Sequence, residues 1–204
     1  METTTTTVFG PALETMKTVK SPDGEMLTKP FLNVCRNVLP VIEKFGASMA
    51  IVKSDVGGNI ARLDAKYDTD PTAFNGLYEI VRKEIAAKTA RGSSSSTNGL
   101  LWLTRAMDFL VELFRNLLAH AEWTMGQCAT AAYTCTLKEY HGWIASTAFT
   151  VAMKLIPDRK KFLELLGSGN LDEDMQSFVS NFSPLLAENH AFLKSVGLDD
   201  MKAS

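Results

Sequence analysis

Apolar residues recur at spacings of three and four along most of the chain, the spacing typical of helices that bury one face. This pattern predicts helices at residues 30–45, 49–63, 71–88, 100–118, 126–140, 143–156, 158–166 and 173–195. Pro40 is expected to kink or end the first of them, and Asp70-Pro71 is typical of an N-cap followed by a first helical position. No segment alternates like a strand. We therefore predict one all-α domain of about eight helices.

The helix predicted at residues 100–118 is apolar around most of its circumference, which is typical of a central helix covered on several sides. The serine-rich run at residues 92–97 indicates a loop before it. Periodicity alone does not choose between a helical bundle and a two-layer sandwich. We expect the domain to span residues 1–204, with a flexible stretch of about eight residues at its N-terminus.

The chain of 204 residues is long enough for one domain with a substantial core. A net charge of −2 gives no general attraction to nucleic acid. Cys35, Cys128 and Cys135 are an odd number without metal-type spacing, and the N-terminus lacks the pattern of a signal peptide. Apolar runs are too short to span a bilayer. A cytosolic monomer without metal or cofactor is the simplest expectation.

The most informative polar pattern lies in residues 53–62. Asp55, Asn59 and Arg62 fall at i, i+4 and i+7, so they project from one side of a helix at the edge of its apolar face. A carboxylate acceptor, an amide that donates and accepts, and a forked cation suit a ligand with a polyhydroxyl head and an apolar tail. On spacing alone, a solvated face with a weak polar network is the favoured alternative.

Three blocks of the chain resemble the signature blocks of the glycolipid transfer protein family. They are Ser-Asp-Val-Gly-Gly-Asn-Ile-Ala-Arg at 54–62, Leu-Trp-Leu-Thr-Arg at 101–105 and Lys-Glu-Tyr-His-Gly-Trp-Ile at 138–144. They occur in the family's order and at compatible separations, within a similarity that covers almost the whole chain. The resemblance implies a two-layer helical sandwich that transfers glycosphingolipids between membranes without changing them chemically.

The resemblance also implies a role for each residue of a headgroup site. Asp55 matches a carboxylate that accepts from the ceramide amide and the sugar, and Asn59 matches an amide that binds sugar hydroxyls. Arg62 stands where the animal proteins usually have Lys, which keeps the charge but changes its geometry. Trp102 matches a platform beneath the first sugar ring, and His141 an imidazole that donates to the ceramide acyl carbonyl. Without the resemblance, Trp102 and His141 would be read as ordinary core side chains.

Asn98 lies four residues before Trp102 and could add a sugar hydrogen bond, or it could serve as a helix N-cap. The family's ceramide-1-phosphate branch places cations at positions matching Asn59 and Trp102. An amide and an indole there favour a neutral sugar headgroup such as that of glucosylceramide. The family's C-terminus often brings an aromatic side chain toward the headgroup, and the last residues of this chain have none.

A carrier must also cover the ceramide chains, because exposing about 25 methylenes at roughly 0.8 kcal/mol each would cost on the order of 20 kcal/mol. By resemblance, the chains are expected to contact Ile42, Phe45, Val52, Leu137, Phe149, Val151, Phe162 and Phe178, for which ordinary core packing is the alternative. We expect movable aromatic side chains to fill this tunnel when it is empty. The expected membrane contact is Trp143, with basic attraction from Lys154, Arg159, Lys160 and Lys161.

Two other functions remain compatible with these observations. The first is a glycosphingolipid sensor or adaptor that reports to a protein partner. The second is a lipid-modifying enzyme that uses His141 and Asp55 as an acid–base pair. The sequence contains no phosphate-binding loop, His-Glu-x-x-His, Gly-x-Ser-x-Gly or Cys-x-x-Cys motif, and this weakens the enzyme hypothesis.

Overall fold

The computed structural model describes residues 7–202, apart from the side chain of Ser48. These residues form nine α-helices and one short 3-10 helix. The elements are α1 (Gly10–Met16), α2 (Thr28–Glu43), η1 (Ala47–Met49), α3 (Ala50–Thr69), α4 (Leu77–Ala86), α5 (Ser96–Ala119), α6 (Met125–Thr136), α7 (Trp143–Met153), α8 (Arg159–Leu166) and α9 (Leu171–Ser195). Within residues 7–202, β-type backbone pairing is limited to two isolated bridges, and these residues form no β-strand. The prediction of an all-α domain is confirmed.

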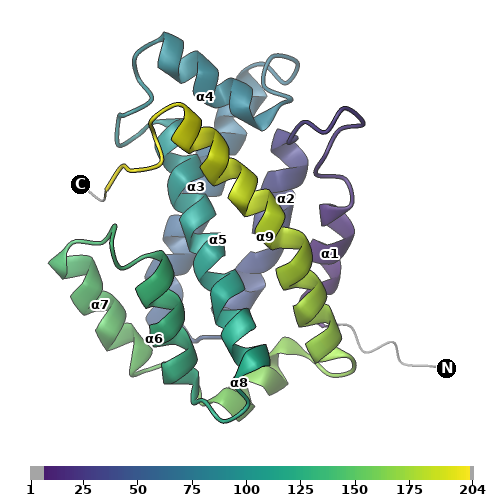
Figure 1. Ribbon diagram of the computed structural model, residues 1–204, viewed down its shortest axis with the longest axis vertical. Helices are drawn as coiled ribbons and strands as arrows, with labels where there is room; N and C mark the ends of the chain where they lie inside the picture. The colour runs from purple at the N-terminus through teal and green to yellow at the C-terminus, as the bar shows by residue number, and fades with distance from the viewer. Residues whose placement is uncertain (1–6, 203–204) are drawn as a thin grey trace.

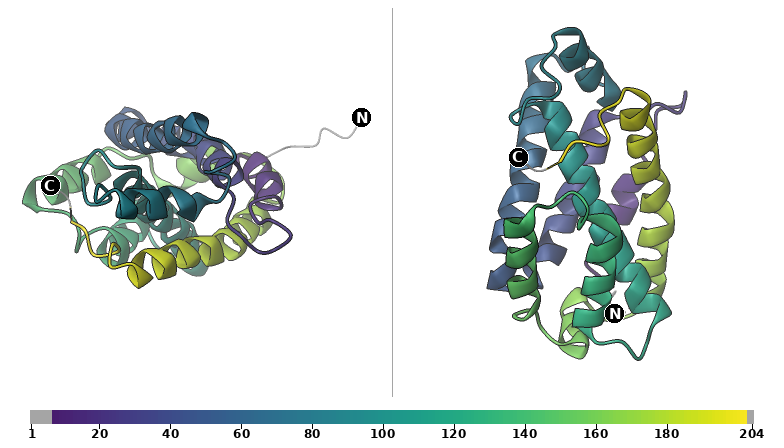
Figure 2. Two further views of the ribbon diagram at one scale, coloured as in Figure 1. Left: turned by 90° about the horizontal axis from the view of Figure 1, so that it is seen from above. Right: turned by 60° about the vertical axis from the view of Figure 1, so that its left-hand side comes forward.

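The helices lie in two layers (Figure 2). In one layer α1 packs on α2 and α2 on α3, and in the other α5 packs on α6 and on α9. Contacts between α3 and α5, and between α1 and α9, join the layers. Helix α4 lies across one end and α8 at the other, while α7 sits outside α6 (Figure 1). The arrangement is the two-layer sandwich that the resemblance implies.

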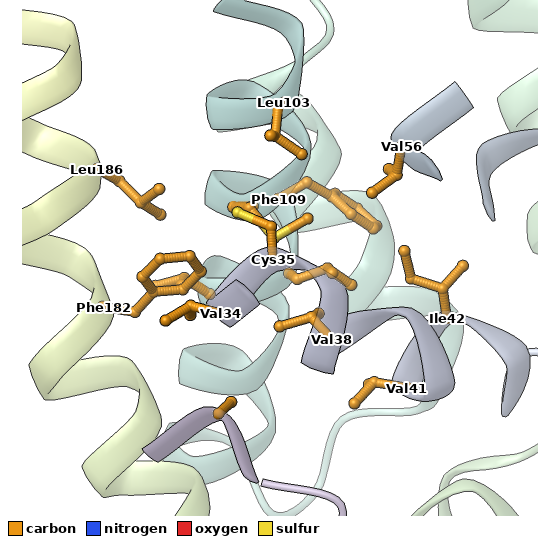
Figure 3. Packing of buried hydrophobic residues seen from close by; sticks show 14 of the residues in the cluster. Val34, Cys35, Val38, Val41, Ile42, Val56, Leu103, Phe109, Phe182 and Leu186 are labelled. Atoms are coloured by element: carbon orange, nitrogen blue, oxygen red, sulfur yellow. The ribbon is translucent and has the colours of Figure 1, made fainter. Parts of the chain in front are cut away.

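Helix α5 occupies the centre, as its apolar circumference predicts. Apolar side chains of α2, such as Val38, meet Phe109 of α5, and Phe182 and Leu186 of α9 lie beside them (Figure 3). Each of these side chains is almost fully buried. Burying one such side chain stabilises the fold by roughly 1.5–3 kcal/mol. The core therefore holds α5 firmly against both layers.

The prediction that a helix begins at Asp70-Pro71 is wrong. Helix α3 continues to Thr69, and residues 70–76 form a turn in which Asp70 Oδ1 accepts from the N–H of Ala73 at 3.0 Å. Tertiary contacts hold the end of this turn extended, because Thr28 N–H donates to Asn75 O and Leu77 N–H to Met26 O, each at 2.8 Å. Helix α4 can therefore begin only at Leu77.

Two further differences concern the first half of the chain. Pro40 does not end α2, because Val41 and Ile42 bury the last turn in the core. The short α1 gives no readable periodicity over its seven residues, and it is held by packing on α2 and α9.

Of the N-terminal stretch of about eight residues expected to be flexible, residues 1–6 lie outside the described residues. Thr7 Oγ1 donates to Asp174 Oδ2 at 2.5 Å, and Val8 N–H donates to the carbonyl of Leu166 at 2.9 Å.

Most side chains expected to contact lipid chains belong to the core. Ile42, Phe45, Phe162 and Phe178 are at most 2% exposed, and Val52, Leu137 and Phe149 pack partly buried against them. Val151 is different, because it is 53% exposed on α7, a helix with no buried residue. This exposure excludes ordinary core packing for Val151, and its contact with a lipid chain stays a prediction. Within the described part of the chain, no helix combines the length and apolarity needed to cross a membrane.

Candidate ligand-binding site

A pocket of about 580 Å³ opens where α3, the α4–α5 loop, α5, the start of α7 and the C-terminal residues meet. Its walls are formed by Asp55, Asn59, Arg62, Arg91, Ser93, Asn98, Trp102, His141, Ala145, Met201 and Lys202. All six residues expected in the headgroup site are among them, although they come from three separate segments. The fold thus gathers these side chains into one concave surface at the end of the core.

Helix α3 supplies the polar side of the pocket. Asn59 is only 5% exposed, and its Nδ2 donates to Asp55 Oδ2 over 3.5 Å. This separation is at the long limit of a hydrogen bond, so the carboxylate keeps most of its capacity to accept from a ligand. The pair therefore presents an acceptor and an amide side by side.

Gly99 allows α3 and α5 to approach at this point. A Cβ at Gly99 would lie 3.3 Å from Arg62 Cδ and 3.7 Å from Asn59 Oδ1. The Arg62 guanidinium crosses to the α4–α5 loop, where Nη1 donates to the carbonyls of Ser93 and Ser95, each at 3.3 Å. Arg62 therefore lines the pocket and also ties the loop to α3.

Asn98 lies in the pocket, and it is not the N-cap of α5. That cap is Ser95, whose Oγ accepts from the Asn98 N–H at 2.9 Å. The Asn98 side chain donates to the Ser93 carbonyl at 3.0 Å, and the residue lines the pocket. A sugar contact for Asn98 stays a prediction.

Trp102 and His141 form the second side of the pocket. Their rings lie 5.7 Å apart at 24°, a stacked arrangement. The Tyr133 hydroxyl donates to Ser146 Oγ at 3.0 Å and lies 3.2 Å from His141 Nδ1, so it orients the imidazole. Donation from His141 Nε2 to a ligand carbonyl requires the Tyr133 proton to turn from Ser146 to Nδ1, because the neutral ring then carries its own proton on Nε2.

Burial shifts the pKa values of Asp55 and His141, which both face the pocket. It raises the pKa of Asp55, and the charge of Arg62 limits the rise. It lowers the pKa of His141, and the charge of Arg105 lowers this pKa further, against the opposing effect of Asp55. His141 is therefore neutral at pH 7, the state in which one ring nitrogen donates and the other accepts.

Sequence reasoning missed the part of the pocket wall that lies nearest the C-terminus. Met201 and Lys202 line the pocket, and beneath them the guanidinium of Arg105 is 1% exposed. It lies 3.4 Å from the centre of the Tyr140 ring and 4.9 Å from that of Trp102. Arg105 lies within the block 101–105, but the polar periodicity of α5 gives it no signal that distinguishes it from a solvated residue.

The surface around α7 matches the expected membrane contact in part. Trp143 is 79% exposed at the start of α7, and Ile144 and Leu155 are also largely exposed. Arg159 is not a free surface cation, which corrects the basic cluster expected there. Its guanidinium caps the C-terminal end of α5 by donating to the carbonyls of Leu117 and His120, and it also donates to the carbonyl of Trp123 in the next loop, at 2.6–3.0 Å.

Comparison with known proteins identifies the family of this chain. The family model described as "Glycolipid transfer protein (GLTP)" matches residues 26–168. The chain is 62% identical over 199 residues to glycolipid transfer protein 1 of Arabidopsis thaliana, a match that covers 97% of this chain and 98% of that protein. This chain belongs to the glycolipid transfer protein family.

More distant proteins are also similar to this chain, in sequence or in fold. The human pleckstrin homology domain-containing family A member 8 is 33% identical over 157 residues, which cover 76% of this chain and 30% of that protein. The structure described under "How FAPP2 Selects Simple Glycosphingolipids Using the GLTP-fold" superposes with a TM-score of 0.88 at 26% identity, over 98% of this chain and 100% of that one. Arabidopsis ACD11 complexed with ceramide-1-phosphate shares the fold, with a TM-score of 0.85 at 22% identity over 95% and 97% of the two chains.

Membership decides between carrier and enzyme. Proteins of the glycolipid transfer protein family are lipid transfer proteins and not enzymes, so His141 and Asp55 are not an acid–base pair for catalysis. Their geometry agrees with this conclusion, because the hydrogen-bond partner of His141 Nδ1 is the Tyr133 hydroxyl and not a carboxylate. The site is built to hold a ligand.

Proposed function

We propose that this protein transfers glycosphingolipids with a small neutral sugar, such as glucosylceramide, between membranes. One observation carries the proposal: a half-buried indole, Trp102, shares a pocket with the Asp55–Asn59 pair. Sugar rings bind proteins through an apolar C–H face and a rim of hydroxyls. The indole suits the first, and the carboxylate and amide suit the second. The name of the 62% identical Arabidopsis protein supports the same ligand class.

Asn59 and Trp102 supply no charge for a phosphate, and two of the cations that line the pocket, Arg62 and Arg91, already bind backbone carbonyls. Asn59 is a buried neutral amide, and Trp102 brings no charge, whereas a desolvated phosphate needs charge-assisted hydrogen bonds. His141, neutral and oriented by Tyr133, is suited to donate to the ceramide acyl carbonyl, and Asp55 to accept from the ceramide amide. Together these groups would bind the sugar–amide region of the lipid.

The core next to the pocket supports a place for the two chains. The ring centres of Phe45 and Phe162 lie 4.5 Å apart, and those of Phe149 and Tyr133 lie 3.7 Å apart. We propose that these aromatic side chains separate when lipid enters. Trp143 would insert into the membrane interface during exchange, because indole favours that region. Three free thiols, Cys35, Cys128 and Cys135, are consistent with a cytosolic monomer.

Vesicle-to-vesicle transfer of labelled glucosylceramide, with ceramide-1-phosphate in parallel, tests the proposal. We expect fast transfer of glucosylceramide and little transfer of the phosphate lipid. Trp102→Ala should slow glucosylceramide transfer at least about tenfold, the equivalent of roughly 1.4 kcal/mol of ligand binding.

Trp123 supplies the matched control. It is half-buried, stacks on His120 with ring centres 3.7 Å apart, and lies outside the headgroup pocket. Trp123→Ala should leave the preference for glucosylceramide unchanged. Transfer of neither lipid by the unmodified protein would exclude the carrier function and favour a sensor that binds lipid without delivering it.

A further inference from the structure

The C-terminal segment, residues 198–202, forms a wall of the headgroup pocket without a helix or strand of its own. Leu198 is buried, and its N–H donates to the carbonyl of Leu193 at 2.9 Å. Beyond it, Met201 and Lys202 reach the pocket. Their position must therefore be set by side chains from other elements.

Arg105 of α5 makes the main attachments. Its Nη1 donates to the carbonyl of Met201 and its Nη2 to the carbonyl of Asp199, each at 2.6 Å. Two more contacts reinforce them. His190 of α9 lies with Nδ1 2.6 Å from Asp199 Oδ1, and Arg91 Nη2 donates to the carbonyl of Gly197 at 2.6 Å.

The burial of Arg105 is costly in itself. The side chain is 1% exposed and its Nε is buried without a hydrogen-bond partner. The carboxylates of Asp199 and Glu139 favour its charge, but neither forms an ion pair with it among the described residues. A buried charge normally has an ionic partner, since desolvation is otherwise unfavourable. Here the two carbonyls of the C-terminal segment and the faces of Tyr140 and Trp102 stabilise it. A neutral side chain would fill the space but could not make both attachments.

We propose that Arg105 is a positioning residue for headgroup recognition, and that it holds the C-terminal segment in place as the outer wall of the pocket. The inference rests on the proposed function and adds to it a residue that does not touch the ligand. Met201 and Lys202 then occupy the place for which this chain has no C-terminal aromatic residue. The same guanidinium lies against Trp102, so it sets the sugar platform and the opposing wall together.

A double-mutant cycle tests the inference on the full-length chain. Arg105→Lys keeps the charge but loses the fork that reaches two carbonyls. We expect it to lower affinity for glucosylceramide in vesicles about tenfold and affinity for ceramide, which has no sugar, less than about twofold. Met201→Ala/Lys202→Ala should produce the same selective loss. Arg105→Lys added to that background should cost less than a further twofold, because the wall it positions is already missing.

Arg115→Lys is the control, since Arg115 lies on the same helix and its guanidinium binds Glu112 and Ser183 Oγ instead of the C-terminal segment. It should change neither affinity. Equal losses for glucosylceramide and ceramide, or full additivity in the cycle, would overturn the positioning role. If Arg105→Lys does not fold, an unchanged sugar preference in Met201→Ala/Lys202→Ala overturns it as well.

Hydrogen exchange without ligand separates this inference from the proposed function. Arg105→Lys should speed exchange of the Leu198 amide, which donates to the carbonyl of Leu193 at the start of the segment, at least about tenfold relative to amides in the middle of α9. That result would stand even if the unmodified protein bound no glycolipid, in which case only the proposed function would fail. Unchanged exchange would contradict the attachment itself.

Discussion

The ionised carboxylate of Asp55 suits ligand binding but lowers the stability of the fold. Burial raises its pKa, so the folded protein holds this carboxylate ionised less readily than the unfolded chain does. Between the ordinary value near 3.8 and the raised one, the folded state binds more protons, and stability falls as pH rises through this interval. At neutral pH the ionised carboxylate therefore opposes folding.

The first prediction concerns Asp55→Asn. The variant should bind glucosylceramide at least about tenfold more weakly, because an amide oxygen is a weaker acceptor than a carboxylate. Its melting temperature at pH 7 should equal or exceed that of the unmodified protein. Vesicle binding measures the affinity, and thermal unfolding at pH 4 and pH 7 measures the stability. The stability of the variant relative to the parent should increase toward pH 7. A lower melting temperature at pH 7 would contradict this account.

At the scale of elements, α5 depends on a residue from another helix for its C-terminal end. The last carbonyls of a helix lack partners within it, and a cation near them is favourable. Arg159 of α8 meets this need by donating to the carbonyls of Leu117 and His120 at 2.6–2.7 Å, and it also donates to the carbonyl of Trp123 in the following loop at 3.0 Å. The attachment fixes the central helix to the end of the molecule opposite α4 (Figure 1).

We therefore expect Arg159→Ala to lower the free energy of unfolding by about 2–4 kcal/mol, since hydrogen bonds to charged groups are worth about 1.5–3 kcal/mol each and do not add fully. Denaturant unfolding measures it. Lys160→Ala, at the exposed neighbouring position, should change stability by less than about 0.5 kcal/mol. Similar values for the two variants would show that Arg159 acts only as a surface cation.

Helix α7 is the element with least anchorage. It contains no buried residue, and its first residue, Trp143, is largely exposed. Trp143→Ala should lower partitioning to neutral vesicles about threefold to tenfold and leave the affinity for glucosylceramide in detergent unchanged. Co-sedimentation measures the partitioning, with the half-buried Trp123→Ala as control. Equal partitioning of Trp143→Ala and the unmodified protein would exclude this anchor.

At the scale of the whole molecule, His190 joins three separate segments. Its Nε2 lies 2.6 Å from Asp108 of α5, and its Nδ1 lies 2.6 Å from Asp199 of the C-terminal segment. Hydrogen bonds to these carboxylates outweigh burial and raise the pKa of His190 to about 9. Arg105, Glu112, Arg115 and Tyr140 line the same groove. The charged imidazole therefore links α9, α5 and the segment at neutral pH.

Because the folded-state pKa lies above the unfolded-state value of 6.5, this contribution is complete below pH 6.5 and is lost as pH rises through 9. We expect the unmodified protein to exceed His190→Gln in unfolding free energy by about 2 kcal/mol more at pH 6 than at pH 9.5. Urea unfolding across this range measures the difference. A difference independent of pH would show that the imidazole does not gain its charge on folding.

Much of the fold and part of the site could be predicted from the chain alone. The apolar spacing in α2, α3, α5 and α9 reports which face each helix buries, because the helical period brings those residues to one side. The stripe of Asp55, Asn59 and Arg62 follows from the same period. Local turn chemistry was less reliable at Asp70, since contacts from residues 26–28 hold the turn that delays α4.

The sequence by itself determined most of the helices, though neither α1 nor the start of α4, together with the central place of α5 and one polar side of the site. Each of these depends on residues within a few positions of one another. The tertiary structure alone decided the rest. Arg105 and Asp108 lie on the polar stripe of α5 that would otherwise face water, and the C-terminal segment and His190 cover them. The local spacing of residues cannot predict such a contact between residues about a hundred positions apart. The contact forms because distant parts of the chain pack together, and helical periodicity describes only neighbouring residues.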